Sequence, residues 1–352
     1  MKPTLMKGNE AIAEAAIRAG LEAYFGYPIT PQNELFEYIA LHLPARGGVF
    51  LQAESEIAAI NMVYGAAGAG ARTMTSTSSP GASLMQEGLS YLVGSELPCV
   101  IVNIMRGGPG LGNIAPAQGD YFQATRSAGH GDGRLLVLAP STVQEAADLT
   151  TLAFDLAGHY RNPVMVLGDG ILGQMMEPVT FAAPVPRGPR PAWATTGAGE
   201  GERRLINSIQ LEPAALEEHN LHLQAKYREA AREARWEEYR LEDADVVVAA
   251  YGIAARVART AVDRAREQGI RAGLLRPITL YPFPRAAFAA RASADRVFLV
   301  VELSAGQLRE DVELAVAGRA RVELYGRLGG AMVDPPAVLE RIAGVAKGAV
   351  LA

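Results

Sequence analysis

Short apolar runs alternate with helical stretches along the first 180 residues. The apolar runs predict strands at 22–26, 49–52, 72–77, 100–104, 135–139 and 164–167. The stretches between them predict helices at 10–19, 31–43, 56–68, 82–93 and 143–157. This alternation is typical of a parallel sheet that is covered by helices on both faces.

The same alternation returns near the end of the chain, after a break. Strands are predicted at 246–250, 272–275, 297–301 and 322–325, and helices at 254–268, 308–317 and 336–345. In the break, residues 182–201 are rich in Pro, Gly and Ala, and residues 216–241 read as a charged connecting helix. The sequence therefore predicts an α/β domain at 1–180, a linker with a charged helix at 181–243, and a second α/β domain at 244–352.

Composition narrows the class of protein. The 352 residues are 49% hydrophobic and carry a formal net charge of −5, with no basic stripe. Nucleic acid and anionic membrane surfaces are therefore poor partners. No apolar run approaches the length of a membrane span, and the N-terminal residues lack the apolar stretch of a signal peptide. These features favour a cytoplasmic protein.

Cysteine and histidine usage gives no sign of a metal site in this chain. The single cysteine, Cys99, lies in an apolar run and is predicted to be a small buried residue. One thiol excludes an internal disulfide and a cluster held by several thiolates. The five histidines are scattered, so the sequence predicts no metal ligands here.

Ligands of parallel sheets bind at the carboxyl ends of the strands, so the loops after the strands are the places to search. Tyr27-Pro28-Ile29-Thr30-Pro31 follows the first predicted strand. Taken alone, it is explained as a helix start, with Thr30 as the N-cap and Pro31 at the first helical position.

Glu54 and Glu56 lie where the next strand meets a helix, and both are explained by favourable charge at a helix N-terminus. The helix itself is rich in Ala and Gly, which would let another backbone come close. The third loop, 76–81, is rich in hydroxyl side chains. It suits either helix capping or anion binding.

The fourth loop is the longest, at 105–133, and contains eight glycines. Long loops without secondary structure are uncommon unless they are functional or disordered. Arg106 follows directly on a buried strand, where its planar guanidinium suits a carboxylate ligand. A structural salt bridge explains Arg106 equally well.

The order and content of these four loops resemble the N-terminal, pyrimidine-binding domain of the pyruvate:ferredoxin oxidoreductase superfamily. The segments 27–31, 77–81 and 119–120, with Glu56 followed by Gly65, carry this resemblance. Segments 276–282 and 301–304 resemble the next domain of that family. The implied fold is a thiamine-diphosphate-binding (pyrimidine-type) parallel-sheet domain followed by a transketolase C-terminal-like α/β domain.

The resemblance also implies roles for individual residues. Glu56 is the expected catalytic residue, because the family glutamate hydrogen-bonds the aminopyrimidine ring of thiamine diphosphate and favours its imino tautomer. Thr30 and Arg106 match positions that hold the oxygens of the substrate. The expected cofactor contacts, in addition to Glu56, are Tyr27, Pro28, Ile29 and Ser79.

Part of the family's active site has no counterpart in the sequence. A magnesium–diphosphate motif needs Gly-Asp-Gly after a strand and an asparagine some way downstream. Gly168-Asp169-Gly170 follows a strand but has no asparagine before Asn207, and Gly131-Asp132-Gly133 has Asn162 downstream but follows no strand. Both segments are therefore interpreted as turns. The resemblance therefore places the diphosphate and Mg²⁺ on a beta subunit and [4Fe-4S] clusters on partner subunits. Gamma and ferredoxin-like delta subunits, ferredoxin, coenzyme A and a 2-oxoacid are the other expected partners.

The segment 105–123 is most similar to the VorB type of subunit in 2-oxoisovalerate oxidoreductases, which implies 3-methyl-2-oxobutanoate as substrate. Subunits that act on 2-oxoglutarate or pyruvate are the alternatives, and a non-catalytic scaffold subunit is another. A Rossmann dehydrogenase would need Gly-x-Gly-x-x-Gly closing the first strand. The glycines near Pro109 have the wrong spacing and no predicted helix after them.

Overall fold

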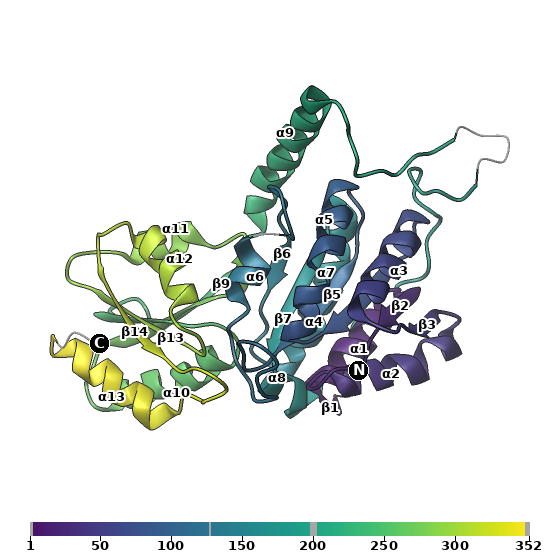
Figure 1. Cartoon of the computed structure of the whole chain (residues 1–352). Helices are drawn as coiled ribbons and strands as arrows, with labels where there is room; N and C mark the ends of the chain where they lie inside the picture. Colours follow the sequence, from purple (N-terminus) through teal and green to yellow (C-terminus); the bar gives the residue numbers. More distant parts are fainter. Residues whose placement is uncertain (1–2, 127, 198–202, 349–352) are drawn as a thin grey trace.

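The computed structural model describes residues 3–126, 128–197 and 203–348, as two α/β domains side by side (Figure 1). Residues 198–202 in the predicted linker, residue 127 in the long loop, and the ends 1–2 and 349–352 lie outside the described residues. Helix α9 (Pro213–Ala230) stands out from the body above the junction of the domains. No helix of the described ranges is long and apolar enough to cross a membrane.

The first domain is built on a seven-stranded sheet with the order β12-β6-β7-β5-β4-β2-β3, parallel except for β12. Its strands are β2 (Ala23–Gly26), β3 (Val49–Gln52), β4 (Thr73–Thr77), β5 (Val100–Met105), β6 (Leu136–Leu138), β7 (Val164–Asp169) and β12 (Thr279–Tyr281). The helices are α1 (Gly8–Arg18), α2 (Asn33–His42), α3 (Glu56–Gly68), α4 (Ser79–Leu84), α5 (Gln86–Gly94), α6 (Tyr121–Arg126), α7 (Val143–Tyr160) and α8 (Gly170–Gln174). A short 3₁₀ turn (Pro44–Arg46) and a separate two-stranded antiparallel sheet, β1 (Thr4–Lys7) with β8 (Met176–Val179), complete it.

Both faces of this sheet are buried, which explains its apolar strands. In β5, Val100 and Val102 pack into a cluster with residues of α1, α2 and α7, whereas Ile101 and Met105 face a cluster that includes α3 and α5. Successive side chains of a strand point to opposite faces, so an uninterrupted apolar run fits a central strand. Cys99 is buried in the second of these clusters, as predicted from its neighbours.

The second domain has a five-stranded sheet with the order β14-β13-β10-β11-β9. Its strands are β9 (Trp236–Tyr239), β10 (Val246–Ala249), β11 (Ala272–Pro277), β13 (Val297–Glu302) and β14 (Arg321–Gly326). The helices are α10 (Gly252–Glu267), α11 (Arg285–Arg291), α12 (Gln307–Val316) and α13 (Pro335–Ala346).

The predicted charged helix at 216–241 is shorter than expected. Helix α9 (Pro213–Ala230) and a 3₁₀ turn (Ala231–Glu233) end before β9, which pairs antiparallel with β11. The aromatic residues Trp236 and Tyr239 favour a strand. Glu237, between them, forms ion pairs with Arg259 and Arg276 of the second domain, so tertiary contacts outweigh the local charge pattern.

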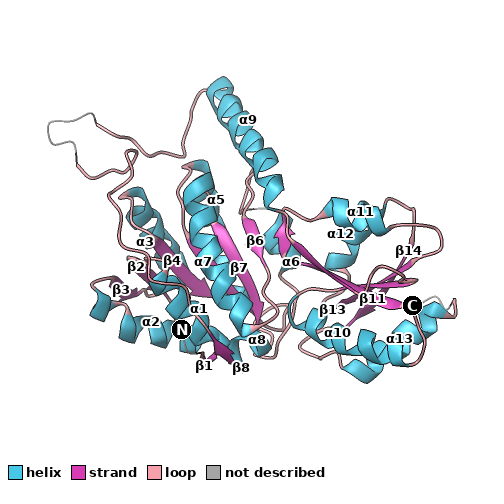
Figure 2. Cartoon of the chain, turned by 180° about the vertical axis from the view of Figure 1, so that it is seen from behind, coloured by secondary structure: helices cyan, strands magenta, loops and turns pink. Residues whose placement is uncertain are grey.

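One strand that follows the second domain's β11 in the chain belongs to the sheet of the first domain and so connects the two domains. Strand β12, which follows β11 in the chain, pairs antiparallel with β6 at the edge of the first sheet. Figure 2 shows β6 on the side of the first domain that faces the second domain. The side chain of the fully buried Gln118 adds polar contacts across the junction. Its amide donates to the Tyr251 carbonyl (2.9 Å) and its oxygen accepts from the Leu303 amide (2.9 Å).

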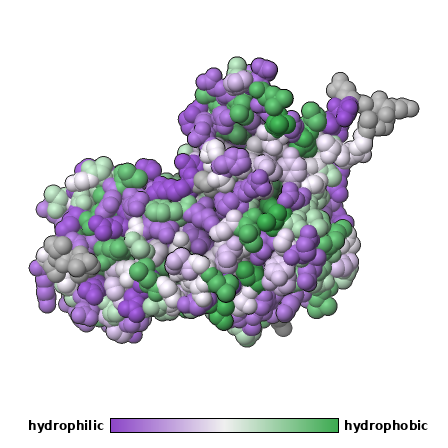
Figure 3. All heavy atoms as spheres, viewed as in Figure 1, coloured by the Kyte–Doolittle hydropathy of each residue, from purple (hydrophilic) through white to green (hydrophobic). Residues whose placement is uncertain are grey.

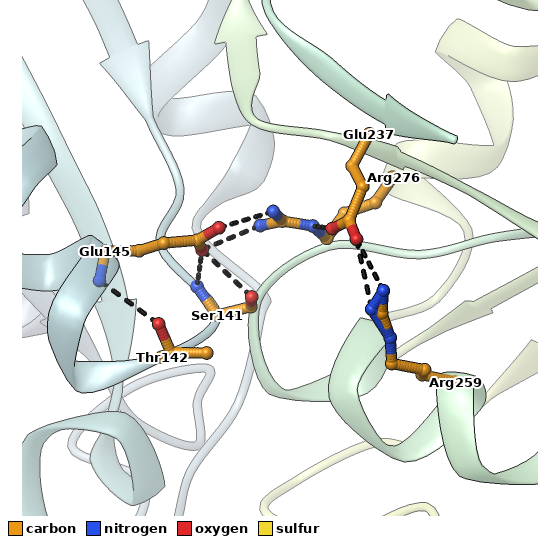
Figure 4. A network of polar contacts seen from close by, with 6 residues as sticks. All are labelled: Ser141, Thr142, Glu145, Glu237, Arg259 and Arg276. Carbon is orange, nitrogen blue, oxygen red and sulfur yellow. Dashed lines mark hydrogen bonds and ion pairs between the residues drawn. The ribbon is translucent and has the colours of Figure 1, made fainter. Parts of the chain in front are cut away.

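An ionic network makes a third connection between the domains (Figure 4). The buried guanidinium of Arg276 donates two hydrogen bonds to Glu145 of α7 (2.9 and 2.6 Å) and one to Glu237 of β9 (2.8 Å). Glu145 also accepts from the amide and hydroxyl of Ser141. Burial alone would raise the pKa of Glu145, but the Arg276 contacts outweigh it and lower this pKa. The two domains are therefore held in one fixed arrangement.

Candidate functional site at the carboxyl edge of the first sheet

The turn after β2 is built differently from the predicted helix start. Helix α2 begins at Asn33 with Gln32 as its N-cap, so Thr30 and Pro31 lie in the turn before it. Gln32 is fully buried and accepts a hydrogen bond from the Ser76 hydroxyl (2.6 Å). The side-chain amide of Asn33 donates to the Thr30 hydroxyl (3.2 Å), which leaves the hydroxyl proton of Thr30 available to another acceptor.

Of the two predicted carboxylates after β3, the structure buries one. Glu56 opens α3 and is 5% exposed, whereas Glu54 is exposed. Ser55 caps the helix by accepting from the Ala58 amide (3.2 Å). Within the described ranges, no hydrogen bond or ion pair reaches the Glu56 carboxylate. The Glu56 carboxylate therefore has hydrogen-bonding capacity that no group of the described residues uses, although its oxygens are not among the fully buried atoms without a partner.

The backbone of α4 lies against Glu56. A Cβ atom added at Gly81 would come 2.4 Å from Glu56 Oε1 and 2.1 Å from Thr77 Oγ1. The Thr77 and Ser78 hydroxyls are buried without hydrogen-bond partners. The hydroxyl-rich loop after β4 therefore encloses Glu56, and only glycine fits at position 81.

Arg106 directly follows β5 and is 8% exposed. Its guanidinium donates to the carbonyls of Thr30 (3.0 Å) and Leu111 (3.2 Å), and its buried Nε has no hydrogen-bond partner. No carboxylate of the described residues forms an ion pair with Arg106, so the structural salt bridge weighed from the sequence is absent there. The structure thus brings two predicted residues, Thr30 and Arg106, into contact.

Ser79, the predicted cofactor contact at the start of α4, joins the same cluster. Its hydroxyl donates to Asp120 Oδ2 (2.6 Å) and accepts from the Arg106 amide (3.0 Å). Ser79 and Arg106 line a cavity of about 530 Å³ between the two domains. Leu303 and Ser304 of the second domain form its other wall. Tyr27 and Pro28 are exposed on the turn after β2, and Ile29 is half-buried.

The long loop after β5 is ordered by its own hydrogen bonds. The Gly107 amide donates to the Ala115 carbonyl (2.9 Å), and the Asn113 amide donates to the Gly107 carbonyl (3.0 Å). The Asn113 side chain also donates to the Gly329 carbonyl of the second domain (2.8 Å). Helix α6 lies further along this stretch, which was expected to be a loop throughout. The loop therefore presents fixed side chains, among them the exposed Leu111 and Ile114.

The segment Gly168-Asp169-Gly170 is not the open turn expected from the sequence. Asp169 ends β7 and caps α8, where its Oδ1 accepts from the amides of Ile171 and Leu172 (3.0 Å each). Burial raises the pKa of Asp169 to about 6, although these amides act in the opposite direction. Gly131 and Asp132 do lie in an exposed turn. Among the described residues, no group of three or more His, Cys, Asp or Glu could hold a metal ion.

Comparison with known proteins gives consistent matches over most of the chain. Residues 14–240 match the family described as pyruvate flavodoxin/ferredoxin oxidoreductase, thiamine diP-bdg, and residues 244–338 match pyruvate:ferredoxin oxidoreductase core domain II. Ketoisovalerate oxidoreductase subunit VorB of Methanothermobacter thermautotrophicus is 52% identical, over 98% of this chain and 99% of its own length. The 2-oxoglutarate synthase subunit KorA of the same organism is 40% identical, over 96% and 97%.

Among solved structures, the 2-oxoglutarate:ferredoxin oxidoreductase from Magnetococcus marinus aligns with a TM-score of 0.85 and 28% identity. The alignment covers 98% of this chain, which spans 65% of the length of that chain. A split-gene transketolase aligns with a TM-score of 0.60 at 14% identity, which shows a likeness of fold alone.

Proposed function

Because the chain belongs to the 2-oxoacid:ferredoxin oxidoreductase family, we propose that it supplies the pyrimidine half of a shared thiamine diphosphate site in a branched-chain enzyme. The proposed reaction joins the acyl part of 3-methyl-2-oxobutanoate to coenzyme A, releases CO₂ and passes electrons to ferredoxin. The observation that carries the proposal is the buried Arg106 guanidinium, which lacks a carboxylate partner among the described residues. A buried cation favours an anionic ligand beside it.

Glu56 is the proposed catalytic residue. When bound, thiamine diphosphate supplies the nucleophile and the electron sink for decarboxylation. The unpartnered Glu56 carboxylate would accept a hydrogen bond from the aminopyrimidine ring and hold a proton there. Its burial, in contrast to the exposed Glu54, supports this choice. The exclusion of side chains at Gly81 would keep the carboxylate in place.

Thr30 and Arg106 are proposed to hold the substrate. The free proton of the Thr30 hydroxyl would be donated to a substrate oxygen, and the guanidinium would pair with the carboxylate. Tyr27, Pro28, Ile29 and Ser79 are proposed to contact the cofactor. The Ser79 hydroxyl already donates to Asp120, so it would act there as an acceptor.

The surroundings of Arg106 support a branched aliphatic acid over 2-oxoglutarate. The loop whose carbonyl binds Arg106 carries two exposed apolar side chains, Leu111 and Ile114. A second carboxylate would need another cation, whereas an isopropyl group favours apolar neighbours. The higher identity to the VorB subunit than to KorA points the same way. The presence of both Glu56 and Arg106 speaks against a purely scaffolding subunit.

The rest of the enzyme is proposed to lie on partner chains in the cytoplasm. A beta subunit would hold the diphosphate and Mg²⁺, and gamma and ferredoxin-like delta subunits or their equivalents would hold [4Fe-4S] clusters. Nucleic acid and membranes are not proposed as partners. Asp169 is the buried carboxylate of the two Gly-Asp-Gly segments, and it already accepts hydrogen bonds from three backbone amides. Because these contacts use its oxygens, they support the placement of Mg²⁺ on a partner chain.

The test is reduction of viologen by the purified complex with each of three acids. We expect the largest specificity constant for 3-methyl-2-oxobutanoate, with smaller values for pyruvate and 2-oxoglutarate. Arg106→Ala should raise KM for the acid, and Arg106→Lys should restore only part of the loss, because an ammonium cannot form the two-pronged contact. Equal specificity constants in wild type and Arg106→Ala would exclude the proposed role of Arg106.

A further inference from the structure

A ring of hydrogen bonds behind Arg106 contains two residues, Asn103 and Asp120, that have no part in the mechanism described so far. Asp120 precedes α6, Asn103 lies in the buried strand β5, and Ser79 starts α4. Asp120 Oδ2 accepts from both the Ser79 hydroxyl (2.6 Å) and the Asn103 amide (3.0 Å). The ring closes where the Ser79 backbone amide donates to Asn103 Oδ1 (3.0 Å). Three separate segments therefore meet at one carboxylate oxygen.

The ring also fixes the end of β5. The Ser79 hydroxyl, held by Asp120, accepts from the Arg106 backbone amide (3.0 Å). The guanidinium of Arg106 reaches the Thr30 and Leu111 carbonyls from this anchored backbone. A displacement of Ser79 would thus be transmitted to the Arg106 peptide and to the direction of its side chain. Small errors of placement have large effects on a positioned ligand.

The position of Asp120 between water and the interior fits a positioning role. It is half-buried and lines the same interdomain cavity as Ser79 and Arg106. Burial raises its pKa, whereas the Ser79 and Asn103 hydrogen bonds lower it. No cation of the described residues forms an ion pair with it. The Asp120 carboxylate accepts two hydrogen bonds, from Ser79 and Asn103, and both go to its Oδ2 atom.

We propose that Asp120 is a positioning residue, which holds Arg106 through Ser79 in the orientation that binds the substrate carboxylate. The proposal rests on the function proposed above. It predicts that the acceptor geometry of Asp120 matters and that its charge does not. An amide oxygen at the same place can accept both hydrogen bonds, because the other carboxylate oxygen has no partner among the described residues.

The test compares Asp120→Ala and Asp120→Asn in the complete complex. Asp120→Ala should raise KM for the 2-oxoacid roughly tenfold with a smaller change in kcat, because a hydrogen-bonding partner is lost behind the binding residue. Asp120→Asn should recover most of this loss. A rise in the half-saturating concentration of thiamine diphosphate is expected only together with the rise in KM, because Ser79 is also a proposed cofactor contact. Asp132→Ala, which removes an exposed carboxylate of the same long segment, is the matched control.

A double variant tests the route through Ser79. Ser79→Ala should raise KM as Asp120→Ala does, and combining the two should add little, because residues that act through one contact are not additive. An unchanged KM in Asp120→Ala would overturn the proposal. So would an equal loss in Asp120→Asn, which would indicate a role for charge, or a change confined to cofactor saturation.

Hydrogen exchange separates this inference from the proposed function. In Asp120→Ala, the Arg106 amide should exchange faster than in wild type, and Asp120→Asn should restore its protection. This readout needs no turnover, and the protection of peptides from the second domain reports whether the variant is folded. Unchanged protection at Arg106 in a folded Asp120→Ala chain contradicts the positioning role, whichever acid the enzyme uses.

Discussion

Two buried carboxylates at the same edge of the first sheet, Glu56 and Asp169, have opposite surroundings. Asp169 accepts hydrogen bonds from the amides of Ile171, Leu172 and Ile253, the last from the second domain. Glu56 has no such partner among the described residues. A satisfied carboxylate stabilises a junction, whereas an unsatisfied one is available for a ligand. A change at Glu56 is therefore expected to affect turnover, and a change at Asp169 is expected to affect stability.

Replacing Glu56 with Gln should lower turnover of the complex strongly. Glutamine keeps the shape of the side chain, so assembly should persist, but it cannot take a proton, and such groups contribute about 10²–10⁴-fold. Glu54→Gln is the matched control, because Glu54 is exposed two residues earlier. The measurement is viologen reduction with saturating thiamine diphosphate. Near wild-type turnover in Glu56→Gln, with loss in Glu54→Gln, would show that the wrong carboxylate was chosen.

Asp169 should make folding depend on pH. Its pKa is about 6 in the folded chain and near 3.8 when exposed, so the folded state holds a proton that the unfolded state loses between these values. Stability from this group is therefore present at low pH and falls as pH rises from about 4 to about 6. Asp169→Asn removes this dependence. The variant should gain on wild type by up to about 3 kcal/mol between pH 4 and pH 7.

Denaturant unfolding of the full chain at several pH values measures this difference. Asp148→Asn, at an exposed position of α7, is the control and should track wild type at every pH. The comparison uses differences between variants at one pH, so the titration of other groups cancels. A gap between Asp169→Asn and wild type that stays constant from pH 4 to pH 7 would contradict the raised pKa.

At this scale the sequence pointed to four candidate residues, Glu56, Thr30, Arg106 and Ser79, through the family resemblance, and their binding roles stay predictions. The structure gathers Thr30, Ser79 and Arg106 into one cluster. Asn103 was missed, although a polar residue inside the apolar run of β5 was a visible signal. The roles of buried amides depend on partners that are distant in sequence, and no local pattern reveals them.

At the scale of elements, the alternation of apolar runs and helical stretches predicted most strands of the two main sheets and the helices between them. The bounds of β3 and α3 agree with the predicted ranges, and the predicted family and fold class are confirmed by the comparisons. The strands that were missed, β1, β8, β9 and β12, lie at sheet edges or in a two-stranded pair. Such strands are short and take their stability from pairing with a partner, so local sequence says little about them.

Gly81 in α4 lies at a position of the site where a larger side chain has no room. Gly81→Ala should disturb the site, because the new Cβ would overlap Glu56 Oε1 and Thr77 Oγ1. Neither side chain can move far in a buried setting, so we expect a loss of about 1–3 kcal/mol of stability and a large fall in turnover. Thermal unfolding and viologen reduction measure the two effects.

Gly158→Ala provides the matched control for this substitution. Gly158 lies in α7, away from the site, and nothing comes within 4 Å of a Cβ added there. Alanine is the better helix former, so this variant should keep full activity and gain up to about 1 kcal/mol. If Gly81→Ala keeps the activity and stability that Gly158→Ala keeps, then α4 does not pack against Glu56 as closely as described.

At the scale of the whole molecule, apolar side chains remain on the surface of the first domain and of the segment before α9. Figure 3 shows apolar residues grouped on the first domain and around helix α9 at the top of the view. Exposed large apolar residues include Val49, Leu51, Ile57, Leu84, Leu111, Leu205, Ile209 and Leu211. Extended apolar surface of this kind is typical of protein–protein contacts. It agrees with the proposal that partner chains complete the active site.

The isolated chain should be inactive and should bind thiamine diphosphate weakly. The diphosphate is strongly anionic and is normally bound through Mg²⁺ with oxygen ligands, and the described residues contain no acidic cluster of that kind. The purified chain should also be colourless, because one buried cysteine cannot hold an iron–sulfur cluster. Calorimetry with Mg²⁺ and the cofactor is the measurement. Tight stoichiometric binding would place the whole site within this chain.

The pairing of β12 with β6 limits how the protein can be recombined with its relatives. The two family matches meet between residues 240 and 244, which suggests a natural point for exchanging modules. A fragment that ends there would lack β12, and the buried strand Leu136–Leu138 would become an open sheet edge. Open apolar edges recruit strands from other molecules. In a chimera joined at this point, residues 279–281 come from the other parent, so its first domain is protected only if that strand can pair with β6.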